Sequence, residues 1–189
     1  MTRINVAVIV GSARRESINR KLAGALMQLG ASGAEFSVVE IADLPMFNQD
    51  LESDLPAAVT RFKAALAAAD AVLFVTPEHN RSIPALLKNA IDWGTRPRGH
   101  NNWAGKTVAI TGTSQGAIAT AVAQQHLRQI VGNLGAVVAG GETYITFRPD
   151  LIDEAGGIAD QSVRDFLQAF LDKFAVLAVT LAAARPKTG

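Results

Sequence analysis

The sequence of 189 residues contains no cysteine. This absence excludes disulfides, thiol nucleophiles, thiolate metal sites and dithiol redox relays. If the protein moves electrons, a bound cofactor therefore has to carry them. The three histidines, His79, His100 and His126, lie far apart in sequence with no Glu-x-x-His pairing, so we expect no metal site.

Excess charge of either sign is also absent, because 18 basic and 17 acidic residues give a formal net charge of +1. We therefore expect no nucleic-acid partner, which would need a strongly basic surface. No apolar run reaches the roughly 20 residues that span a bilayer. The Ala/Val/Leu-rich stretch near the C-terminus is interrupted by Lys173. We interpret that stretch as a core helix and expect no membrane partner.

No charged leader or signal-type apolar core precedes the first strand pattern, so we expect a cytoplasmic protein. Apolar residues are plentiful: 49% of the chain is hydrophobic and 19% is charged, which is enough to bury a sheet. No internal repeat or low-complexity linker interrupts the sequence. We therefore expect residues 1–189 to form a single domain.

Apolar runs that predict strands alternate with patterns that predict helices. Strands are predicted at residues 6–10, 36–41, 71–75, 107–111 and 136–138, and helices at residues 17–29, 56–69, 84–93, 117–132 and 160–184. Continuous apolar runs are typical of strands buried on both faces. Strands separated by helices imply right-handed crossovers and a parallel sheet. We therefore expect an α/β fold of flavodoxin-like type, a doubly wound five-stranded parallel sheet of order 2-1-3-4-5 in three layers, αβα.

Ligands of such folds bind beyond the carboxyl ends of the strands, at the switch point between strands 1 and 3. Three loops meet at this point, at residues 11–17, 76–82 and 112–116. Each contains polar residues or glycines that are unusual for turns so short. We expect the ligand site where these three loops converge.

The first loop combines hydroxyl, amide and guanidinium groups with the start of a helix. Unpaired N–H groups and the positive dipole end of a helix together favour a bound phosphate. We therefore expect a phosphate to be held by Ser12, Arg14, Ser17 and Asn19. The alternative is a plain cap, with Ser17 or Asn19 capping the helix and the arginines solvated.

Other phosphate-binding motifs are missing from the sequence. No Gly-x-Gly-x-x-Gly follows the first strand, which argues against dinucleotide binding of the Rossmann type. No Gly-Lys-Ser/Thr occurs, which argues against a nucleoside triphosphatase. A receiver domain of the same fold would need clustered carboxylates for a divalent metal after the first strand, where this chain is basic.

The second loop, T-P-E-H-N-R-S-I-P from residue 76, has a proline near its start and another where the next helix begins. A rigid loop of this kind can direct backbone N–H and C=O groups at the edge of a flat heterocycle such as an isoalloxazine. We expect such a ring to contact Pro77, Glu78, His79, Asn80 and Arg81. The alternatives are a surface histidine at position 79 and local turn chemistry for Glu78 and Asn80.

The third loop contains two glycines and three hydroxyl residues within residues 111–116. This composition suits close approach of the backbone to a ring. We expect Thr113, Ser114, Gln115 and Gly116 to line the other side of the ring. The alternative is an ordinary turn from strand to helix.

Four motifs together resemble the NAD(P)H-dependent FMN reductases of flavodoxin-like fold, a group that includes bacterial quinone and chromate reductases. They are GSARRESINRKLA (residues 11–23), LPMFNQDLE (44–52), PEHNRSIPALLKNAIDW (77–93) and HLRQ (126–129). They cover the first two thirds of the chain in the family's order. The resemblance implies noncovalent FMN with its phosphate on the first loop and its ring against the other two. It also implies NADPH or NADH as co-substrate and a homodimer that is sometimes doubled to a tetramer.

The chain departs from the family pattern at three places. His79 stands where relatives usually have tyrosine in P-E-Y-N, and Gln125 replaces a second tyrosine. Residues 119–122 read Ala-Thr-Ala-Val where relatives often have Gly-Gly-x-Arg. In some relatives that arginine and the second tyrosine help to hold the tetramer. The resemblance therefore supports a dimer more directly than a tetramer.

The resemblance implies an oxidoreductase that works in two steps. NAD(P)H delivers hydride to the flavin and leaves, and a small-molecule electron acceptor then takes its place in a ping-pong sequence. Quinones, free flavins, azo compounds, nitroaromatics and oxidised metal ions such as chromate are all candidate acceptors. One alternative is a flavodoxin-type FMN electron carrier, although carriers tend to be strongly acidic and this chain is not. Another is a domain that binds a phosphorylated ligand without turnover.

Overall fold

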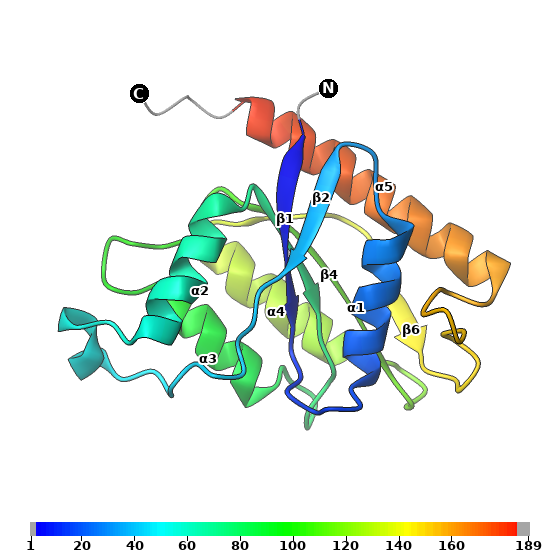
Figure 1. Ribbon diagram of the computed structural model, residues 1–189, viewed down its shortest axis with the longest axis horizontal. Helices are drawn as coiled ribbons and strands as arrows, with labels where there is room; N and C mark the ends of the chain where they lie inside the picture. Colours follow the sequence, from blue (N-terminus) through cyan, green and yellow to red (C-terminus); the bar gives the residue numbers. More distant parts are fainter. Residues whose placement is uncertain (1–2, 185–189) are drawn as a thin grey trace.

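The computed structural model describes residues 3–184 (Figure 1). In chain order the elements are β1 (Ile4–Val10), α1 (Ile18–Leu29), β2 (Ala34–Val38), the 3-10 helix η1 (Gln49–Ser53), α2 (Ala57–Ala68), β3 (Ala71–Val75), α3 (Ala85–Gly94), β4 (Thr107–Ser114), α4 (Ala121–Asn133), β5 (Val137–Val138), β6 (Tyr144–Thr146) and α5 (Gln161–Ala184). All strand pairs are parallel, in the order β2-β1-β3-β4-β5, and β6 also pairs with β4. The predicted flavodoxin-like fold and strand order are confirmed.

Helices cover both faces of the sheet in a three-layer arrangement. Successive strand residues point to opposite faces, so Ile9 and Phe74 pack with α2, α3 and α4, whereas Val8 and Leu73 pack with α1 and α5. All four side chains are fully buried. Figure 1 shows α2 and α3 on one side of the strands and α1 and α5 on the other. Burial on both faces explains why the strands are continuous apolar runs.

The C-terminal helix α5 is, within residues 3–184, the one helix whose length and apolar composition would allow it to cross a membrane. The apolar residues on one side of α5 pack against the rest of this fold. Leu167, Leu171 and Phe174 are fully buried against the sheet together with residues of α1. This packing agrees with the interpretation of the segment as a core helix for one side of α5, whereas Phe166 and Val176 are exposed.

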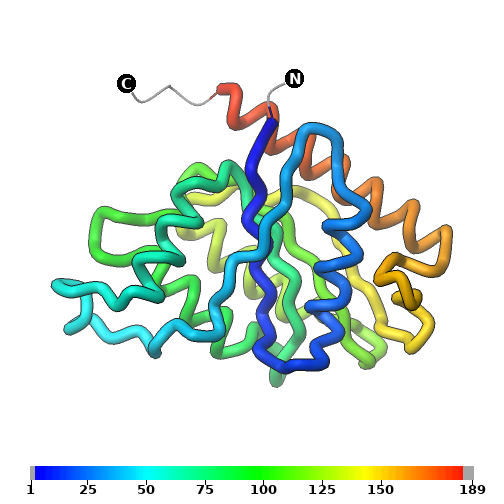
Figure 2. Tube along the Cα trace, viewed as in Figure 1, coloured from blue at the N-terminus to red at the C-terminus, as the bar shows by residue number. Residues whose placement is uncertain are grey.

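The carboxyl ends of the central strands lie close together. Val10 and Val75 end β1 and β3 side by side, and Val75 lies beside Thr111, after which β4 continues to Ser114. The segments that leave these strands gather at the lower edge of the molecule in Figure 2. The three loops selected from the sequence therefore lie side by side.

Three predicted boundaries were wrong near this edge. The second strand spans Ala34–Val38 instead of residues 36–41, because Val38 is the last residue in register with β1. The fourth strand continues to Ser114 instead of ending at residue 111, because β6 pairs with residues 112–114 and extends the ladder. The fourth helix begins at Ala121 instead of residue 117, because Ala119 has a φ of 50° and cannot continue a right-handed helix. The predicted fifth strand is only two residues long, and β6 occupies the rest of that side of β4.

Two glycines allow the strand ends to pack closely around Thr76, which is fully buried. A Cβ on Gly112 would lie 1.9 Å from the Thr76 carbonyl oxygen, and a Cβ on Gly11 would lie 2.5 Å from the Thr76 hydroxyl. Neither distance is compatible with a side chain. The floor of the loop region therefore requires glycine at both positions.

We predict that Gly112→Ala destabilises the protein by about 3 kcal/mol or more, because the new methyl group would force β3 and β4 apart. The matched control is Gly24→Ala in α1, where a Cβ would meet nothing within 4 Å. This control should stabilise the protein by about 0.5–1 kcal/mol, because alanine favours the helix. Urea unfolding of both variants measures the difference. Equal stabilities would contradict the close approach at Thr76.

Candidate functional site

Two adjoining cavities open at the carboxyl edge of the sheet, with volumes of about 650 and 550 Å³. The larger is lined by Gly11, Ser12, Ala13, Arg14, Ser17, Ile18, Asn19, Pro77, His79, Pro84, Ala85, Leu86, Thr113, Ser114 and Gln115. The smaller is lined by Glu78, Asn80, Arg81, Ser114, Gly116, Ala117, Ile118 and Ala119. Ser114 belongs to both. All thirteen residues selected from the sequence therefore line one cavity or the other.

In the first loop, three of the predicted phosphate donors bond to the protein itself. The Ser12 hydroxyl accepts a hydrogen bond from the Arg14 backbone N–H at 3.4 Å. The Ser17 hydroxyl accepts a hydrogen bond from the Arg20 backbone N–H (3.2 Å) and so caps α1. The Asn19 amide nitrogen donates to the Thr113 carbonyl oxygen, and its oxygen accepts from the Thr113 backbone N–H, both at 2.9 Å. Asn19 is almost fully buried. It therefore ties the start of α1 to the end of β4.

Other donors of the first loop are free. The Arg14 guanidinium is exposed and has no hydrogen bond or ion pair with any residue in the range 3–184. The backbone N–H groups of Ala13 and Arg15 also lack a partner within that range. The nearby Glu16 carboxylate is paired with Lys21 at 3.4 Å. Free N–H groups, a free guanidinium and the positive end of α1 make this loop suitable for an anion.

The second loop contains a tight two-residue turn. His79 and Ser82 exchange two backbone hydrogen bonds of 2.9 Å, and the two residues between them, Asn80 and Arg81, have φ values of 49° and 63°. Two successive positive φ values define a type I′ turn, which normally favours Asn-Gly. Arginine in place of glycine is strained there, so surrounding contacts have to hold the turn in place.

Glu78 supplies such a contact. Its side chain is only 7% exposed, and one carboxylate oxygen accepts hydrogen bonds of 3.0 Å from the backbone N–H groups of Val122 and Ala123. The other oxygen accepts from the Arg81 guanidinium at 2.8 Å. Thr120, which precedes α4, makes no side-chain cap. Glu78 therefore caps α4 from a distant loop and pairs with the strained Arg81.

A second contact joins the same two parts of the chain. The His126 ring nitrogen Nδ1 lies 3.1 Å from the Ser82 hydroxyl, so α4 is bonded to both ends of the turn. Together with Glu78, this contact makes the turn and α4 one connected unit. The aligned backbone of α4 and the charge of Glu78 stabilise each other, since a carboxylate is favoured at a helix N-terminus.

The third loop is also held by its own side chains. The Ser114 hydroxyl donates to the Ala119 carbonyl oxygen (2.7 Å) and accepts from the Gly116 backbone N–H (3.2 Å). The Gln115 amide is exposed and has no partner within residues 3–184. The Thr113 hydroxyl is buried and lacks a hydrogen-bond partner. A buried hydroxyl without a partner beside a cavity is an open position for a polar ligand atom.

The polar residues of the site thus form two groups. The engaged residues, which bond to the protein and hold the loops, are Ser12, Ser17, Asn19, Glu78, Arg81 and Ser114. The free residues, whose side chains have no partner in the described part of the chain, are Arg14, His79, Asn80 and Gln115. The first group makes the site rigid, and the second is available to a ligand.

An ion pair fixes the outer side of α1 next to this site. Arg20 donates two hydrogen bonds to the Glu40 carboxylate, at 2.9 and 3.4 Å, and joins α1 to the segment after β2. These hydrogen bonds hold the pKa of Glu40 below its usual range and raise the pKa of Arg20. Both groups therefore stay charged near neutral pH.

Some lining residues were not predicted from the sequence. The start of α3 supplies Pro84, Ala85 and Leu86 to the larger cavity, and residues 117–119 line the smaller one. Pro84 at the beginning of a helix that follows the second loop was the available signal for the first group. No group of three His, Cys, Asp or Glu side chains that could hold a metal ion occurs within residues 3–184.

We predict that Glu78→Ala lowers the free energy of unfolding by about 2 kcal/mol, because charge-assisted hydrogen bonds to α4 are lost. Amide hydrogen exchange should accelerate both in the 77–82 loop and in the first turn of α4. The matched control is Asp160→Ala, because Asp160 also caps a helix, accepting from the Val163 backbone N–H at 3.0 Å. Its effect should be confined to the start of α5. Exchange that is unchanged in the 77–82 loop of Glu78→Ala would contradict the coupling.

Comparison with known proteins identifies the family. Residues 4–149 match the family model described as NADPH-dependent FMN reductase. A 2-hydroxy-1,4-benzoquinone reductase from Burkholderia sp. is 47% identical over 173 residues, which are 91% of this chain and 94% of that protein. A quinone reductase from Pseudomonas putida is 48% identical over 90% of this chain and 92% of that protein.

A solved structure is similar over nearly the whole fold. The flavoenzyme NAD(P)H:(acceptor) oxidoreductase FerB from Paracoccus denitrificans superimposes with a TM-score of 0.90 at 42% identity. The alignment covers 94% of this chain and 98% of that protein. This likeness extends beyond the part that matches the family model. The chain belongs to the NADPH-dependent FMN reductase family.

Proposed function

We propose that this protein is an FMN-dependent NAD(P)H oxidoreductase that reduces quinones. The observation that carries the proposal is the convergence of three strand-end loops on two adjoining cavities, with engaged side chains that hold the loops and free donors beside the openings. Family membership and quinone reductases at 47% and 48% identity support the same reaction.

The donor set suits FMN. Arg14, the free N–H groups of Ala13 and Arg15, and the N-terminus of α1 would hold its phosphate. The Ser17 hydroxyl accepts from the α1 backbone and can still donate its own hydrogen to a ligand. Asn80 and Gln115 would present amides to the ring. When bound, FMN supplies the capacity to take a hydride from NAD(P)H and to pass electrons to an acceptor.

In this proposal the residues of the chain position and orient the cofactor and its substrates, and the engaged residues keep the loops in place. Asn19 fixes the distance between the first and third loops, and Glu78 fixes the second loop against α4. In this proposal the nicotinamide and the acceptor use the same opening, so one leaves before the other enters and the sequence is ping-pong. An opening of this size supports several acceptors besides quinones, including azo compounds, free flavins and chromate.

We also propose a cytoplasmic homodimer. A cytoplasmic location is consistent with the supply of NAD(P)H and with the absence of cysteine pairs. The apolar side chain of Ile118, beside the smaller cavity, is 45% exposed, and that of Met46 is 73% exposed. Single exposed apolar residues are common on any surface, so the dimer is supported by the family resemblance instead, which implies one. An electron carrier is not favoured, because the relatives are reductases and the net charge is +1.

Purification followed by absorbance spectroscopy and NADPH oxidation tests the proposal. The protein should carry FMN, or take it up, and should oxidise NADPH continuously once 1,4-benzoquinone is added without oxygen. Double-reciprocal plots of initial rate against NADPH concentration, measured at several fixed quinone concentrations, should be parallel lines. Flavin without NADPH consumption would support a carrier instead. A protein that takes up no FMN would contradict the proposed function.

We predict that Arg14→Ala weakens FMN binding by about tenfold or more, since one charge-assisted contact contributes about 1.5–3 kcal/mol. Arg15→Ala is the matched control, because Arg15 is an exposed neighbour whose side chain does not line the cavity. It should change the dissociation constant by less than about threefold. Fluorescence titration of the apoprotein with FMN measures both. Equal losses in the two variants would contradict the phosphate assignment.

A further inference from the structure

Reduction of a quinone needs a proton in addition to the electrons. The balanced reaction is quinone + NAD(P)H + H⁺ → hydroquinone + NAD(P)⁺. NAD(P)H supplies a hydride equivalent, which is two electrons and one proton. The second proton has to reach a quinone oxygen from another donor, and the proposed function does not identify that donor.

Few side chains of the larger cavity can donate a proton near neutral pH. The polar side chains that line it are those of Ser12, Arg14, Ser17, Asn19, His79, Thr113, Ser114 and Gln115. The aliphatic hydroxyls of serine and threonine and the amides are very weak acids, and a guanidinium keeps its proton. Histidine is the side chain that exchanges a proton between about pH 5 and 8. Among these residues, His79 alone has the required chemistry.

The ring of His79 is free while its backbone is fixed. No hydrogen bond or ion pair engages the imidazole within residues 3–184. Its backbone N–H and C=O are both bonded to Ser82 at 2.9 Å, and the adjacent Glu78 is bonded to α4. The imidazole is therefore carried on a rigid turn at the wall of the cavity, with both ring nitrogens available.

Apart from His79, the ionisable groups near this wall in residues 3–184 are paired, lie outside the two cavities or cannot act as acids. On its own loop, the Glu78 carboxylate accepts three hydrogen bonds, one of them from Arg81. On α3, Lys88 and Asp92 pair with each other at 2.8 Å. On α4, His126 contacts Ser82. Across the cavity, Arg14 is a fixed positive charge and cannot serve as an acid.

We propose that His79 is a catalytic acid for the acceptor, an inference that rests on the proposed function. Its imidazolium N–H bond breaks as an O–H bond forms on one quinone oxygen, and solvent then returns the proton to the ring. The electrons and the other proton come from NAD(P)H. A tyrosine at this position, as in P-E-Y-N, also has an O–H donor, so His79→Tyr keeps a proton source where His79→Phe removes it.

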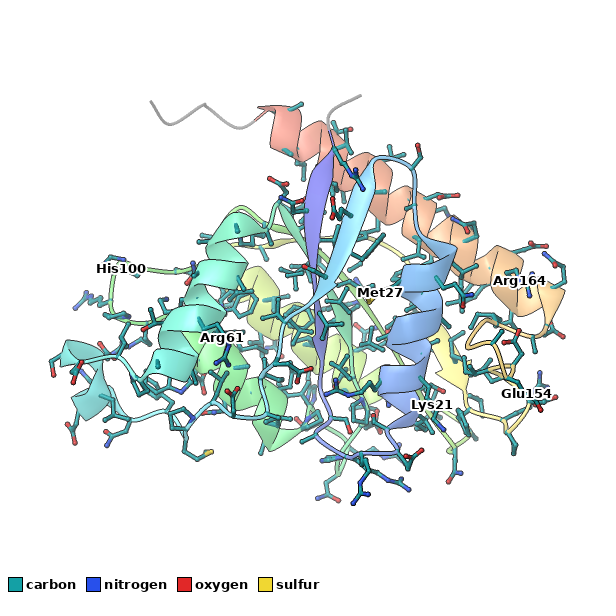
Figure 3. The ribbon with its side chains drawn as sticks, viewed as in Figure 1. Lys21, Met27, Arg61, His100, Glu154 and Arg164 are labelled. Carbon is teal, nitrogen blue, oxygen red and sulfur yellow. The ribbon has the colours of Figure 1, made fainter. Side chains whose placement is uncertain are left out.

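The test compares two acceptors in stopped-flow experiments on FMN-loaded protein first reduced with NADPH. Benzoquinone requires a proton, whereas ferricyanide accepts only an electron. His79→Phe should lower the benzoquinone rate relative to the ferricyanide rate by about 100-fold, the low end of what general-acid catalysis contributes. His79→Tyr should recover most of that ratio. His100→Phe is the control, because His100 is exposed on the loop between α3 and β4, away from the cavity edge (Figure 3).

A binding measurement complements the rates. The ring nitrogen signals of His79, assigned by their loss in His79→Phe, should shift in NMR spectra when hydroquinone is added to FMN-loaded protein, and those of His100 should not. A benzoquinone-to-ferricyanide ratio that is unchanged in His79→Phe, or ring signals that do not respond, would overturn the role of His79. If the unaltered protein reduces neither acceptor, the proposed function itself is contradicted. If only the role of His79 is wrong, the unaltered protein still reduces both acceptors, so the two failures are distinguishable.

Discussion

The two hydrogen bonds between the Asn19 side chain and the Thr113 backbone are the contact on which the site depends. They join residues 94 positions apart, at the start of α1 and near the end of β4. Both residues are buried, so neither the amide nor the backbone groups could exchange this partner for water. A buried polar group that loses its partner costs about 1–3 kcal/mol. The first and third loops are therefore held at one separation, and the larger cavity lies between them.

The second loop is held in a similar way, because a buried carboxylate fixes its strained turn. Glu78 uses one oxygen on the N-terminus of α4 and the other on Arg81, which has a positive φ. The glycines at 11 and 112 let the strand ends close around Thr76 beneath these loops. Because engaged side chains maintain the shape, the free ones at 14, 79, 80 and 115 can face a ligand without first breaking protein contacts. Such preorganisation is what a binding site requires.

Much of the fold could be predicted from the sequence, because its strands and helices follow local patterns of apolar residues. Continuous apolar runs and the intervening helical periods predicted parallel strands buried on both faces, and their number and succession fit the flavodoxin-like order. Two of the features that were not predicted arise from distant pairing or from backbone conformation. Strand β6 forms only because it meets residues 112–114, and the delayed start of α4 follows from the backbone of Ala119. Neither has a local signature.

The residues selected from the sequence line the two cavities, but the sequence did not show which of them hold the loops and which are free. The sequence named Asn19 and Glu78 as ligand-facing residues, yet their partners, Thr113 and the start of α4, lie 94 and 44 or more positions away. Capping of α1 by Ser17, weighed as the plain alternative, does occur and leaves the hydroxyl able to donate. The sequence alone could not show which polar groups are free, because that depends on the tertiary contacts of each side chain.

Backbone amide NMR of the apoprotein during titration with FMN shows whether the cofactor binds where the three loops meet. Shifts should concentrate on the amides of residues 13–15, 79–81 and 113–116, at the carboxyl edge of the sheet. The amide signals of the groove between α1 and residues 147–156, a further cavity of the fold, should not shift. Shifts confined to that groove, or absent from the first loop, would show that FMN does not bind at the loops.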